Sequence, residues 1–565
     1  MTEERKLIIK AGYEKPICER LRADDEQTDS LKIFHDYERE RLKAFTMFSS
    51  RYITSILTPR IMRSWRPGGY IISAQTGAGK STLILEQLLP LAMERKKYVA
   101  IIVPREALAT QYKKEIAKQY CPEQLKIYTD KGISKVSKWG PVNIFTFQSL
   151  RSYSKQQDLL RNKNIYDAVV IDEVHAFVAD AAFNSLTAEI LEFLVVNFAS
   201  DTKRIYLTAT WDIALYEILM LERKLREVSP LQDSKTTIAY RFKSDYSYLA
   251  LKFFQKQDTI IELLKRIPGD EKALIFVNSK KQGLEVKKSL GSQATFVDAE
   301  SKRGEEADTY AELINGQTFS SKYLCATRWL DVGVNIKEEE VKHIVCFQFF
   351  KEEIIQMLGR RRVVSKQQRV NLYMLLPSEN DLLKKSNDIE SENRTMTEAV
   401  NRYCNHSSPG MIEELPFPIY VNEKEGRLGF AYNHYSFAIN QYHFEQLEKF
   451  TNQKGDFKTH FCEEVLGWFP GCGTYKNLDG DLTDMRKKVD DILLPCLNSG
   501  KEFNKEEMML LCENLITVME IQRRADQKDN LPVGTLNKKF SEYGYPYKIQ
   551  NLSGTGKRGC WIITN

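Results

Sequence analysis

A glycine-rich loop directly after an apolar segment constrains this chain more than any other feature. Residues 71–73 read as the end of a buried strand, and the loop Ala74-Gln-Thr-Gly-Ala-Gly-Lys-Ser-Thr82 follows at once. Its two glycines allow a tight turn in which successive N–H groups point at one place, and the helix expected after the loop adds its positive N-terminal end. The sequence therefore predicts an α/β fold with a triphosphate site at the end of a strand.

The lysine and serine that open the expected helix predict ATP and Mg²⁺ as cofactors. Lys80 would neutralise the β- and γ-phosphates, and the Ser81 hydroxyl would bind Mg²⁺. An ordinary glycine turn is the alternative, and a GxGKS sequence after an apolar strand disfavours it. The residues expected to hold the nucleotide in this Walker A loop are Gln75, Thr76, Gly77, Ala78, Gly79, Lys80, Ser81 and Thr82.

A second apolar segment, residues 166–171, ends in two adjacent carboxylates, Asp172 and Glu173. We expect both at the same phosphate site, where Asp172 would bind Mg²⁺ and Glu173 would orient or deprotonate the attacking water. A strand that ends in acidic residues is common by itself. The prediction of a catalytic pair therefore depends on its combination with the loop around Lys80.

These motifs resemble those of the superfamily 2 helicases. The phosphate loop has Ala74 where many such loops have glycine, as in motif I of that family, and Asp172-Glu-Val-His175 is similar to its DExH box. The resemblance implies that His175 couples the ATP site to a second domain. Residues 207–210 resemble motif III, in which Thr208 and Thr210 would link hydrolysis to domain movement.

Four further segments resemble the motifs that lie along nucleic acid or between the domains in that family. They are residues 103–111 (motif Ia), 145–150 (Ib), 273–280 (IV) and 325–336 (V). Each implied contact residue, taken alone, would more often be an ordinary helix-start or strand-end residue. The implied nucleic-acid contacts are Arg105, Gln111, Thr146, Gln148, Ser279, Lys280 and Thr327, and the implied nucleotide neighbours from motif V are Asp331 and Gly333.

Residues 356–362 resemble motif VI, whose arginines reach across a cleft to the γ-phosphate. Guanidinium groups suit this task because they stay charged and match phosphate geometry. Many relatives have a second arginine where this chain has Val363. We therefore expect Gln356, Arg360 and Arg362 at the site and a smaller role for Arg361. A solvated basic patch is the alternative for three adjacent arginines.

Apolar strands alternate with helical segments from Tyr70 to Thr210 and again from Ala273 to Leu376. This pattern predicts parallel sheets flanked by helices. The expected fold class is α/β, with two tandem RecA-like lobes, an N-terminal helical segment and a mixed α+β C-terminal region. The expected boundaries are 1–67 for the N-terminal extension, 68–235 for the ATP-binding first lobe, 236–395 for the second lobe and 396–565 for the C-terminal region.

The C-terminal third carries weaker signals. Its aromatic residues between Phe417 and Trp468 are able to stack bases, but core packing is the favoured use. Residues 500–565 end in a helix, a strand, a glycine-rich turn and a strand, which resembles a winged helix. A plain packing hairpin with a soluble tip is the alternative. In the winged-helix interpretation, the residues facing a phosphate backbone are Lys538, Lys539, Lys557 and Arg558.

The net charge is +6 and the pI about 8.5. This mildly basic composition is compatible with a nucleic-acid partner but does not require one. Apolar runs stay shorter than the roughly 18 residues of a membrane span. The acidic start lacks the core of a signal peptide, and the 10 cysteines form no CxxC pair. We therefore expect a cytoplasmic protein without membrane association. The spacing of His460, Cys462 and Cys472 fits no usual zinc site.

Taken together, the motifs predict an ATP-dependent helicase or translocase that acts on nucleic acid, with DNA as the preferred substrate. One alternative is a motor subunit of a restriction, defence or replication assembly that does not separate strands. Another is a nucleotide-dependent switch that binds a protein partner. The sequence leaves open the choice between DNA and RNA, the polarity, the oligomeric state and the role of the N-terminal extension.

Overall fold

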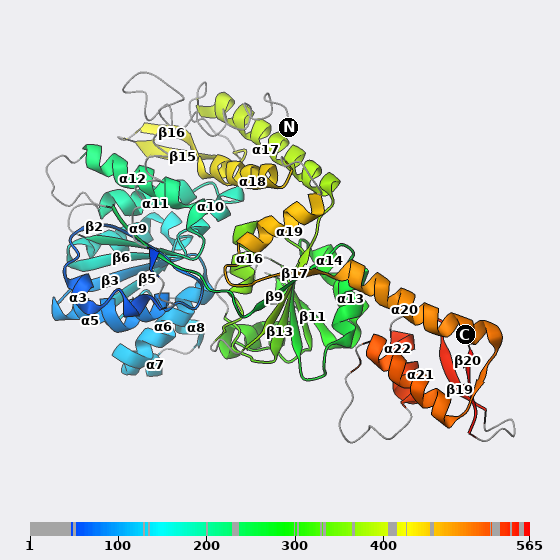
Figure 1. Ribbon diagram of the computed structural model, residues 1–565. Coiled ribbons are helices and arrows are strands. Elements are labelled where there is room, and N and C mark those ends of the chain that lie inside the picture. Colours follow the sequence, from blue (N-terminus) through cyan, green and yellow to red (C-terminus); the bar gives the residue numbers. More distant parts are fainter. Residues whose placement is uncertain are drawn as a thin grey trace.

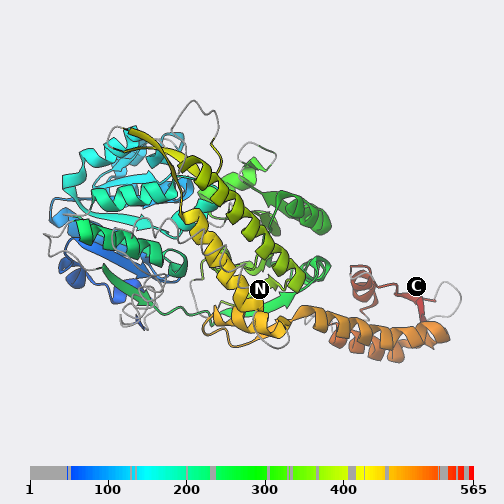
Figure 2. The same cartoon turned by 90° about the horizontal axis from the view of Figure 1, so that it is seen from above.

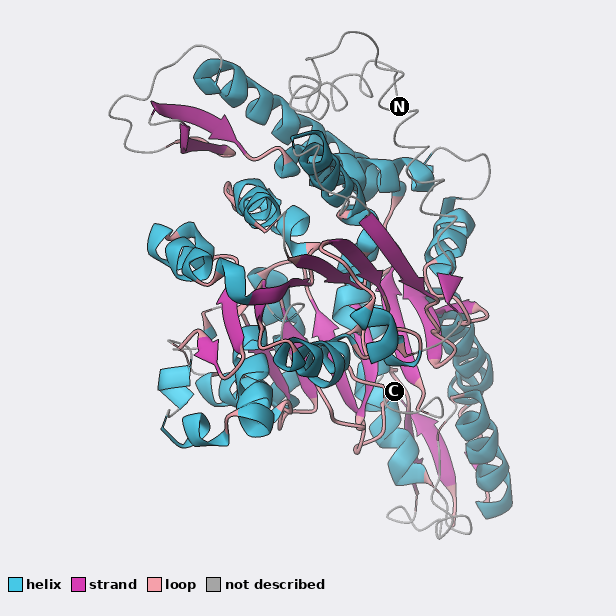
Figure 3. Ribbon diagram, turned by 90° about the vertical axis from the view of Figure 1, so that its left-hand side faces the viewer, coloured by secondary structure: helices cyan, strands magenta, loops and turns pink. Residues whose placement is uncertain are grey.

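Two parallel sheets with helices on both sides form the body of the protein (Figures 1 and 3). The computed structural model describes residues 47–48, 52–127, 130–133, 136–198, 202–228, 237–298, 300–301, 304, 306–327, 330, 335–363, 368–404, 415–424, 427–451, 457–519, 521, 532–542, 545–552 and 559–564. Four predicted site residues lie outside this part of the chain: Asp331, Gly333, Lys557 and Arg558. Most of the predicted N-terminal helical segment lies outside it as well.

The first sheet has eight strands, of which only the last pair is antiparallel. Its central strands are fully buried and largely apolar, as expected for parallel strands covered on both faces, and their charged residues Asp167, Lys203 and Arg204 are paired. In hydrogen-bonded order the strands are β1 (Met47–Phe48), β8 (Thr237–Phe242), β2 (Gly68–Ser73), β7 (Lys203–Thr208), β6 (Tyr166–Asp172), β3 (Tyr98–Val103), β5 (Val142–Thr146) and β4 (Lys138–Trp139).

Helices cover this sheet on both faces. Those that carry or support the site are α4 (Lys80–Thr82), the π-helix η2 (Leu83–Leu88), α6 (Glu106–Tyr120) and α10 (Ala176–Ala179). The others are α3 (Pro59–Arg63), α5 (Leu89–Glu94), α7 (Pro122–Ile127), α8 (Asp130–Ile133), α9 (Tyr153–Arg161), α11 (Thr187–Asn197) and α12 (Leu215–Val228), with the short 3-10 turns η1 (Ile53–Ser55), η3 (Ser149–Arg151), η4 (Lys163–Ile165), η5 (Asp180–Ala182) and η6 (Trp211–Ile213).

The second sheet has seven parallel strands. Their order is β11 (Ala294–Val297), β12 (Tyr323–Ala326), β10 (Lys272–Phe276), β13 (Val341–Cys346), β14 (Val370–Leu375), β9 (Leu249–Phe254) and β17 (Tyr475–Asn477). The flanking helices are α13 (Gln257–Arg266), α14 (Lys280–Leu290), η7 (Gly291–Gln293), α15 (Ala307–Ala311), η9 (Glu312–Gly316) and α16 (Lys351–Leu358). The predicted α/β class with two parallel-sheet lobes is therefore confirmed.

Two strands lie outside the boundaries expected for their lobes. Strand β8 follows residue 235 but pairs with β2 of the first sheet, and β1 pairs with β8 at its edge. Strand β17 comes from the C-terminal region and pairs with β9 of the second sheet. These pairings join distant parts of the chain, and short strands of this kind carry little periodic signal.

An arm of helices and a hairpin follows the second lobe. It consists of α17 (Glu379–Cys404), the antiparallel strands β15 (Ile419–Lys424) and β16 (Arg427–Tyr432), α18 (Tyr435–Thr451) and α19 (Phe457–Gly467). The first half of α18 belongs to the core of lobe 1, through Tyr435 and Ile439, and its second half belongs to the core of lobe 2, through Leu447 and Phe450. The expected core use of the aromatics is thus confirmed for Tyr435, Phe437, Phe444 and Phe461.

The chain ends in a small unit with the helix and strand order of a winged helix. Its elements are α20 (Leu478–Ser499), β18 (Glu502–Phe503), α21 (Lys505–Val518), α22 (Val533–Glu542), β19 (Lys548–Asn551) and β20 (Trp561–Thr564), with the sheet order β18-β20-β19. The unit begins before residue 500, because Val489 and Leu493 of α20 are part of its core. Figure 2 shows it standing apart from both lobes at the end of α20. Within the described ranges, no helix is long and apolar enough for a membrane span.

Candidate nucleotide-binding site between the lobes

The phosphate loop has the conformation that its glycines allow. Gly77 and Gly79 have φ angles of 84° and 91°, in the left-handed region that side chains disfavour, and α4 begins directly after them at Lys80. Lys80 is buried, with its Nζ 3.4 Å from the Ala74 carbonyl oxygen and 3.6 Å from Glu173 Oε1. The loop therefore places its cation and the start of a helix beside the acidic pair.

Asp172 is the last residue of β6 and Glu173 follows it, next to the loop at the end of β2. Asp172 Oδ1 accepts a hydrogen bond from the Glu173 N–H at 3.0 Å. Glu173 has a φ of 51°, which is rare for a residue with a side chain and is often found at functional sites. The two adjacent carboxylates therefore have different neighbours: Asp172 contacts Tyr112, and Glu173 contacts Lys80.

Both Mg²⁺ ligands predicted from the sequence, Ser81 and Asp172, contact the hydroxyl of Tyr112. The Tyr112 hydroxyl lies 2.8 Å from Asp172 Oδ2 and 3.2 Å from Ser81 Oγ. A carboxylate and a hydroxyl oxygen are the hard ligands that Mg²⁺ prefers. The residues present therefore fit the cation.

The acidic pair is buried, and its neighbours act on the two carboxylates in opposite directions. Burial raises the pKa of Asp172 to about 6, assisted by the charge of Glu173 and opposed by Lys80. For Glu173, burial also acts to raise the pKa, but Lys80, His175 and the motif VI arginines outweigh it and lower the pKa below its usual value. Glu173 is thus held as a carboxylate by cations from both lobes.

Motifs II and III meet through His175. Its Nδ1 lies 3.2 Å from Thr208 Oγ1, and Thr208 Oγ1 accepts a hydrogen bond from the Thr210 N–H at 3.0 Å. Burial lowers the pKa of His175, which favours the neutral ring. Just beyond Thr210, Asp212 pairs with Lys351 of the second lobe at 2.7 Å. The three predicted coupling residues are therefore in contact, next to an ion pair between the lobes.

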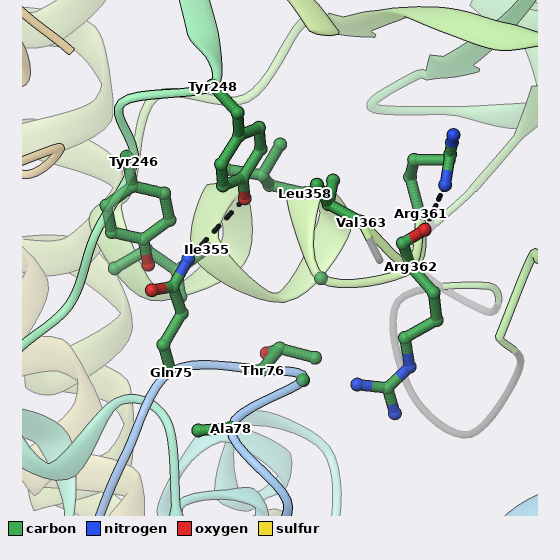
Figure 4. A pocket seen from close by; sticks show the side chains of 12 residues that line it. Gln75, Thr76, Ala78, Tyr246, Tyr248, Ile355, Leu358, Arg361, Arg362 and Val363 are labelled. Atoms are coloured by element: carbon green, nitrogen blue, oxygen red, sulfur yellow. Dashed lines mark hydrogen bonds between the residues drawn. The ribbon is translucent and has the colours of Figure 1, made fainter. Parts of the chain in front are cut away.

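Arg361 and Arg362 of motif VI point in opposite directions (Figure 4). Helix α16 ends at Leu358, a turn follows at Gly359 and Arg360, and Arg361 forms an isolated bridge with Ile336. Arg360 and Arg362 both lower the pKa of Glu173, whereas Arg361 Nε donates to the Val341 carbonyl at 3.0 Å.

Contacts between the lobes close the site over the loop. An added Cβ at Gly359 would lie 2.6 Å from Thr76 Oγ1, and Arg362 Nη1 lies 3.7 Å from where a Cβ would stand at Gly77. Figure 4 shows Gln75 beneath Tyr248, with its Nε2 3.5 Å from the phenol oxygen. The pocket at this junction is lined by Gln75, Thr76, Gly77, Ala78, Tyr246, Tyr248, Ile355, Leu358, Gly359, Arg361, Arg362 and Val363.

Several buried polar atoms around this junction lack a hydrogen-bond partner in the described part of the chain. They come from five of the predicted motifs and are Thr76 Oγ1, Glu173 Oε2, Thr210 Oγ1, Asn335 Oδ1 and Gln356 Nε2. Buried polar atoms are normally paired, so unpaired ones call for an explanation such as a missing ligand or water. Their gathering between the lobes supports a site for a polar ligand there.

Three predicted nucleic-acid contacts share a groove on lobe 1. Arg105, Thr146 and Gln148 line a cavity of about 400 Å³, together with Lys113 and Lys155. Arg105 is already paired there with Asp180 through two hydrogen bonds, one of them from Nη2 to Oδ1 at 2.8 Å. The groove is basic and open, and the Arg105 guanidinium is held in one orientation.

Four other predicted contacts lie elsewhere. Gln111 faces the second lobe, where its Oε1 accepts a hydrogen bond from Asn335 Nδ2 at 3.0 Å. Ser279 caps α14, and Lys280 pairs with Glu300 at 2.6 Å. Thr327 is half-buried after β12. These neighbours do not test nucleic-acid contact, which stays a prediction for all four residues.

Two polar residues at the site were missed by motif reasoning. Tyr112 lies on the buried face of α6, where its spacing indicates only core packing. Asn335 belongs to the motif V segment, and a buried amide at the end of such a motif is a signal that was available. Neither the hydroxyl contact of Tyr112 nor the bond from Asn335 to Gln111 follows from the sequence, because both join segments distant in the chain.

Comparison with known proteins supports the resemblance for the first lobe. Residues 34–213 match the family model described as type III restriction enzyme, res subunit (ResIII). No curated protein matches the chain. The match and the two observed sheets agree with the motifs in indicating a superfamily 2 helicase-like protein.

Solved structures with similar folds have low identity. Dbp5 of S. cerevisiae, bound to RNA and ADP BeF3, is 16% identical over 58% of this chain and 83% of that chain, with a TM-score of 0.40. Lhr of Mycobacterium smegmatis, bound to ssDNA and AMP-PNP, is 15% identical over 59% and 46%, with a TM-score of 0.39. The DEAD-box helicase Mss116, bound to ssRNA and UDP-BeF, is 16% identical over 60% and 73%, with a TM-score of 0.43. Because these values are low, the function is argued from the residues of this chain.

Proposed function

We propose that this protein is an ATP-driven motor of the superfamily 2 helicase type that moves along nucleic acid, with DNA as the preferred substrate, and separates its strands. One observation carries this proposal: a lysine, two carboxylates and two arginines from two separate lobes converge on one phosphate-binding loop. A site assembled from both lobes is sensitive to their separation, and chemistry there is able to drive motion.

Each residue of the site has its own role in ATP hydrolysis. The loop N–H groups and Lys80 hold the phosphates. Ser81 and Asp172 would hold Mg²⁺, which supplies positive charge at the phosphate oxygens. Glu173 Oε2 is buried, accepts no hydrogen bond within the described residues and lies 3.4 Å from His175 Nδ1. A water bound between the lobes would complete its hydrogen bonding and be oriented by it. Arg360 and Arg362 stabilise the charge that develops on the γ-phosphate.

Motion follows from the contacts that join the site to the second lobe. Loss of the γ-phosphate removes the ligand that Arg360 and Arg362 share with the loop, which favours opening of the lobes. The contacts from His175 through Thr208 to Thr210 end next to the ion pair of Asp212 with Lys351. Opening and closing would move the groove at Arg105 relative to the second lobe and so step along a strand.

The test is ATPase activity with and without single- and double-stranded DNA and RNA, with Lys80→Ala as the control for contaminating ATPase. We expect stimulation by nucleic acid, strongest with DNA, and strand separation of a partial duplex in the presence of ATP. Stimulation without strand separation would favour a motor subunit that only translocates. ATPase activity indifferent to every nucleic acid would contradict the proposal and favour a switch that binds a protein.

A further inference from the structure

Tyr112 touches both predicted magnesium ligands, although it belongs to none of the motifs that contact the nucleotide. It is 1% exposed and lies on the face of α6 that packs against the sheet. Its hydroxyl lies 2.8 Å from Asp172 Oδ2 and 3.2 Å from Ser81 Oγ. A phenylalanine would fill the same space, so core packing does not explain the oxygen.

The hydrogen-bonding capacities of the three groups fix the direction of this contact. An ionised carboxylate only accepts hydrogen bonds, so Tyr112 must donate its single proton to Asp172. The Ser81 hydroxyl then donates to the Tyr112 oxygen. This direction leaves the lone pairs of Ser81 Oγ for a cation. The other carboxylate oxygen, Asp172 Oδ1, is held by the Glu173 N–H at 3.0 Å.

We propose that Tyr112 is a positioning residue for the magnesium site, fixing the Asp172 carboxylate and the Ser81 hydroxyl before the cation arrives. This inference rests on the proposed function, because it concerns the same ATP site. Both oxygens of Asp172 are held, so the carboxylate does not have to give up rotational freedom when the cation binds. Residues that orient metal ligands typically contribute about 10- to 100-fold to metal affinity.

Helix α6 supplies a matched control. Tyr120 lies on the same helix and its hydroxyl donates to the Leu85 carbonyl, away from the magnesium ligands. Tyr112→Phe and Tyr120→Phe each remove one hydrogen-bonded hydroxyl from the same helix; that of Tyr120 is half-buried. Only the first removes a contact to Ser81 and Asp172.

The experiment measures the Mg²⁺ requirement for nucleotide binding, without hydrolysis. Fluorescence of mant-AMP-PNP reports binding at a series of free Mg²⁺ concentrations and in EDTA. We expect Tyr112→Phe to raise the Mg²⁺ concentration for half-maximal binding by about 10- to 100-fold. Affinity in EDTA should stay within about twofold of the wild type, and Tyr120→Phe should change neither value.

A double-mutant cycle with Asp172→Asn separates positioning from general damage. If Tyr112 acts through Asp172, its substitution has little further effect on the Mg²⁺ requirement in the Asp172→Asn background. An unchanged Mg²⁺ requirement in folded Tyr112→Phe protein would overturn the inference, as would an equal loss of binding in EDTA. Wild-type protein that binds mant-AMP-PNP with no Mg²⁺ dependence would instead contradict the proposed function itself.

Discussion

Lys80 Nζ and Glu173 Oε1 lie 3.6 Å apart, but the two residues have different proposed roles. We predict that Lys80→Ala abolishes nucleotide binding and turnover, because it removes the charge that compensates the phosphates. Glu173→Gln should keep ATP binding and lower turnover by about a hundredfold or more, since only the handling of water is lost. Binding and single-turnover assays separate the two effects. Glu86→Gln, an exposed position on η2, is the control and should match the wild type.

The arginines of motif VI offer a second test at this scale. We predict that Arg360→Ala and Arg362→Ala each reduce turnover by about a hundredfold or more, as lost γ-phosphate stabilisers do. Arg361→Ala should be much milder, because its guanidinium is occupied by the Val341 carbonyl and points away from the loop. Single-turnover ATPase rates of the three variants decide the assignment. A dominant effect at Arg361 would reverse it.

The sequence predicted many of the residues of the ATP site. The contacts that it did not predict were missed for physical reasons. Lys80, Asp172 and Glu173 lie together because strands β2 and β6 end at the same edge of one parallel sheet, which motif spacing captures. On a helix, Arg360 and Arg362 would point in different directions; the structure brings them to one side because the helix ends before them. The partners of Arg105 and Gln111 depend on tertiary contacts that no local pattern contains.

Helix α18 joins the lobes at the scale of elements. Its start packs on lobe 1, where the Ser436 hydroxyl donates to the Ala181 carbonyl at 2.7 Å, just after the DExH segment. Its later part contacts α16, where Glu352 accepts hydrogen bonds from His443 at 2.6 Å and Gln446 at 3.1 Å. Helix α16 leads directly to the motif VI arginines. The helix α18 therefore spans the two halves of the ATP site.

We predict that Glu352→Ala destabilises the protein by about 1–3 kcal/mol, because it leaves the buried polar groups of His443 and Gln446 without their acceptor. Urea denaturation measures the loss, and separate unfolding of the lobes would accompany it. Asp212→Ala breaks an ion pair that joins the two lobes directly, but both partners are partly exposed, so it should cost no more than about 1 kcal/mol. Equal losses in the two variants would contradict the role assigned to α18.

Helices and strands could be predicted where the hydrophobic pattern that marks them extends over many consecutive residues. The largely apolar central strands of both sheets follow from the sequence. In contrast, β17 has three half-exposed or exposed residues and pairs with a strand more than two hundred positions earlier. The winged-helix resemblance captured the final helix and hairpin. It missed α20 as the first helix of that unit, because the contacts of Val489 and Leu493 are tertiary.

At the scale of the whole molecule, the C-terminal unit and the ATP site are separate structures. Every residue proposed to act on the phosphates of ATP precedes Val363 in the chain. The winged-helix-like unit begins later, at α20, and packs around its own core. Truncation near Lys501 would leave α20 without the partners of its apolar face. Substitution of surface charges is therefore the sharper way to test this unit.

We predict that replacing Lys538, Lys539, Lys557 and Arg558 with alanine spares basal ATPase activity and weakens DNA binding. Each lost phosphate contact should lower the slope of log affinity against log salt by about 0.7 to 0.9, because fewer counterions are released. Binding measured at a series of salt concentrations gives this slope. The control, Lys487→Ala with Lys488→Ala, removes two exposed charges from α20 and should leave the slope unchanged. An unchanged slope in the quadruple variant, with its circular dichroism intact, would show that this surface does not meet the phosphate backbone.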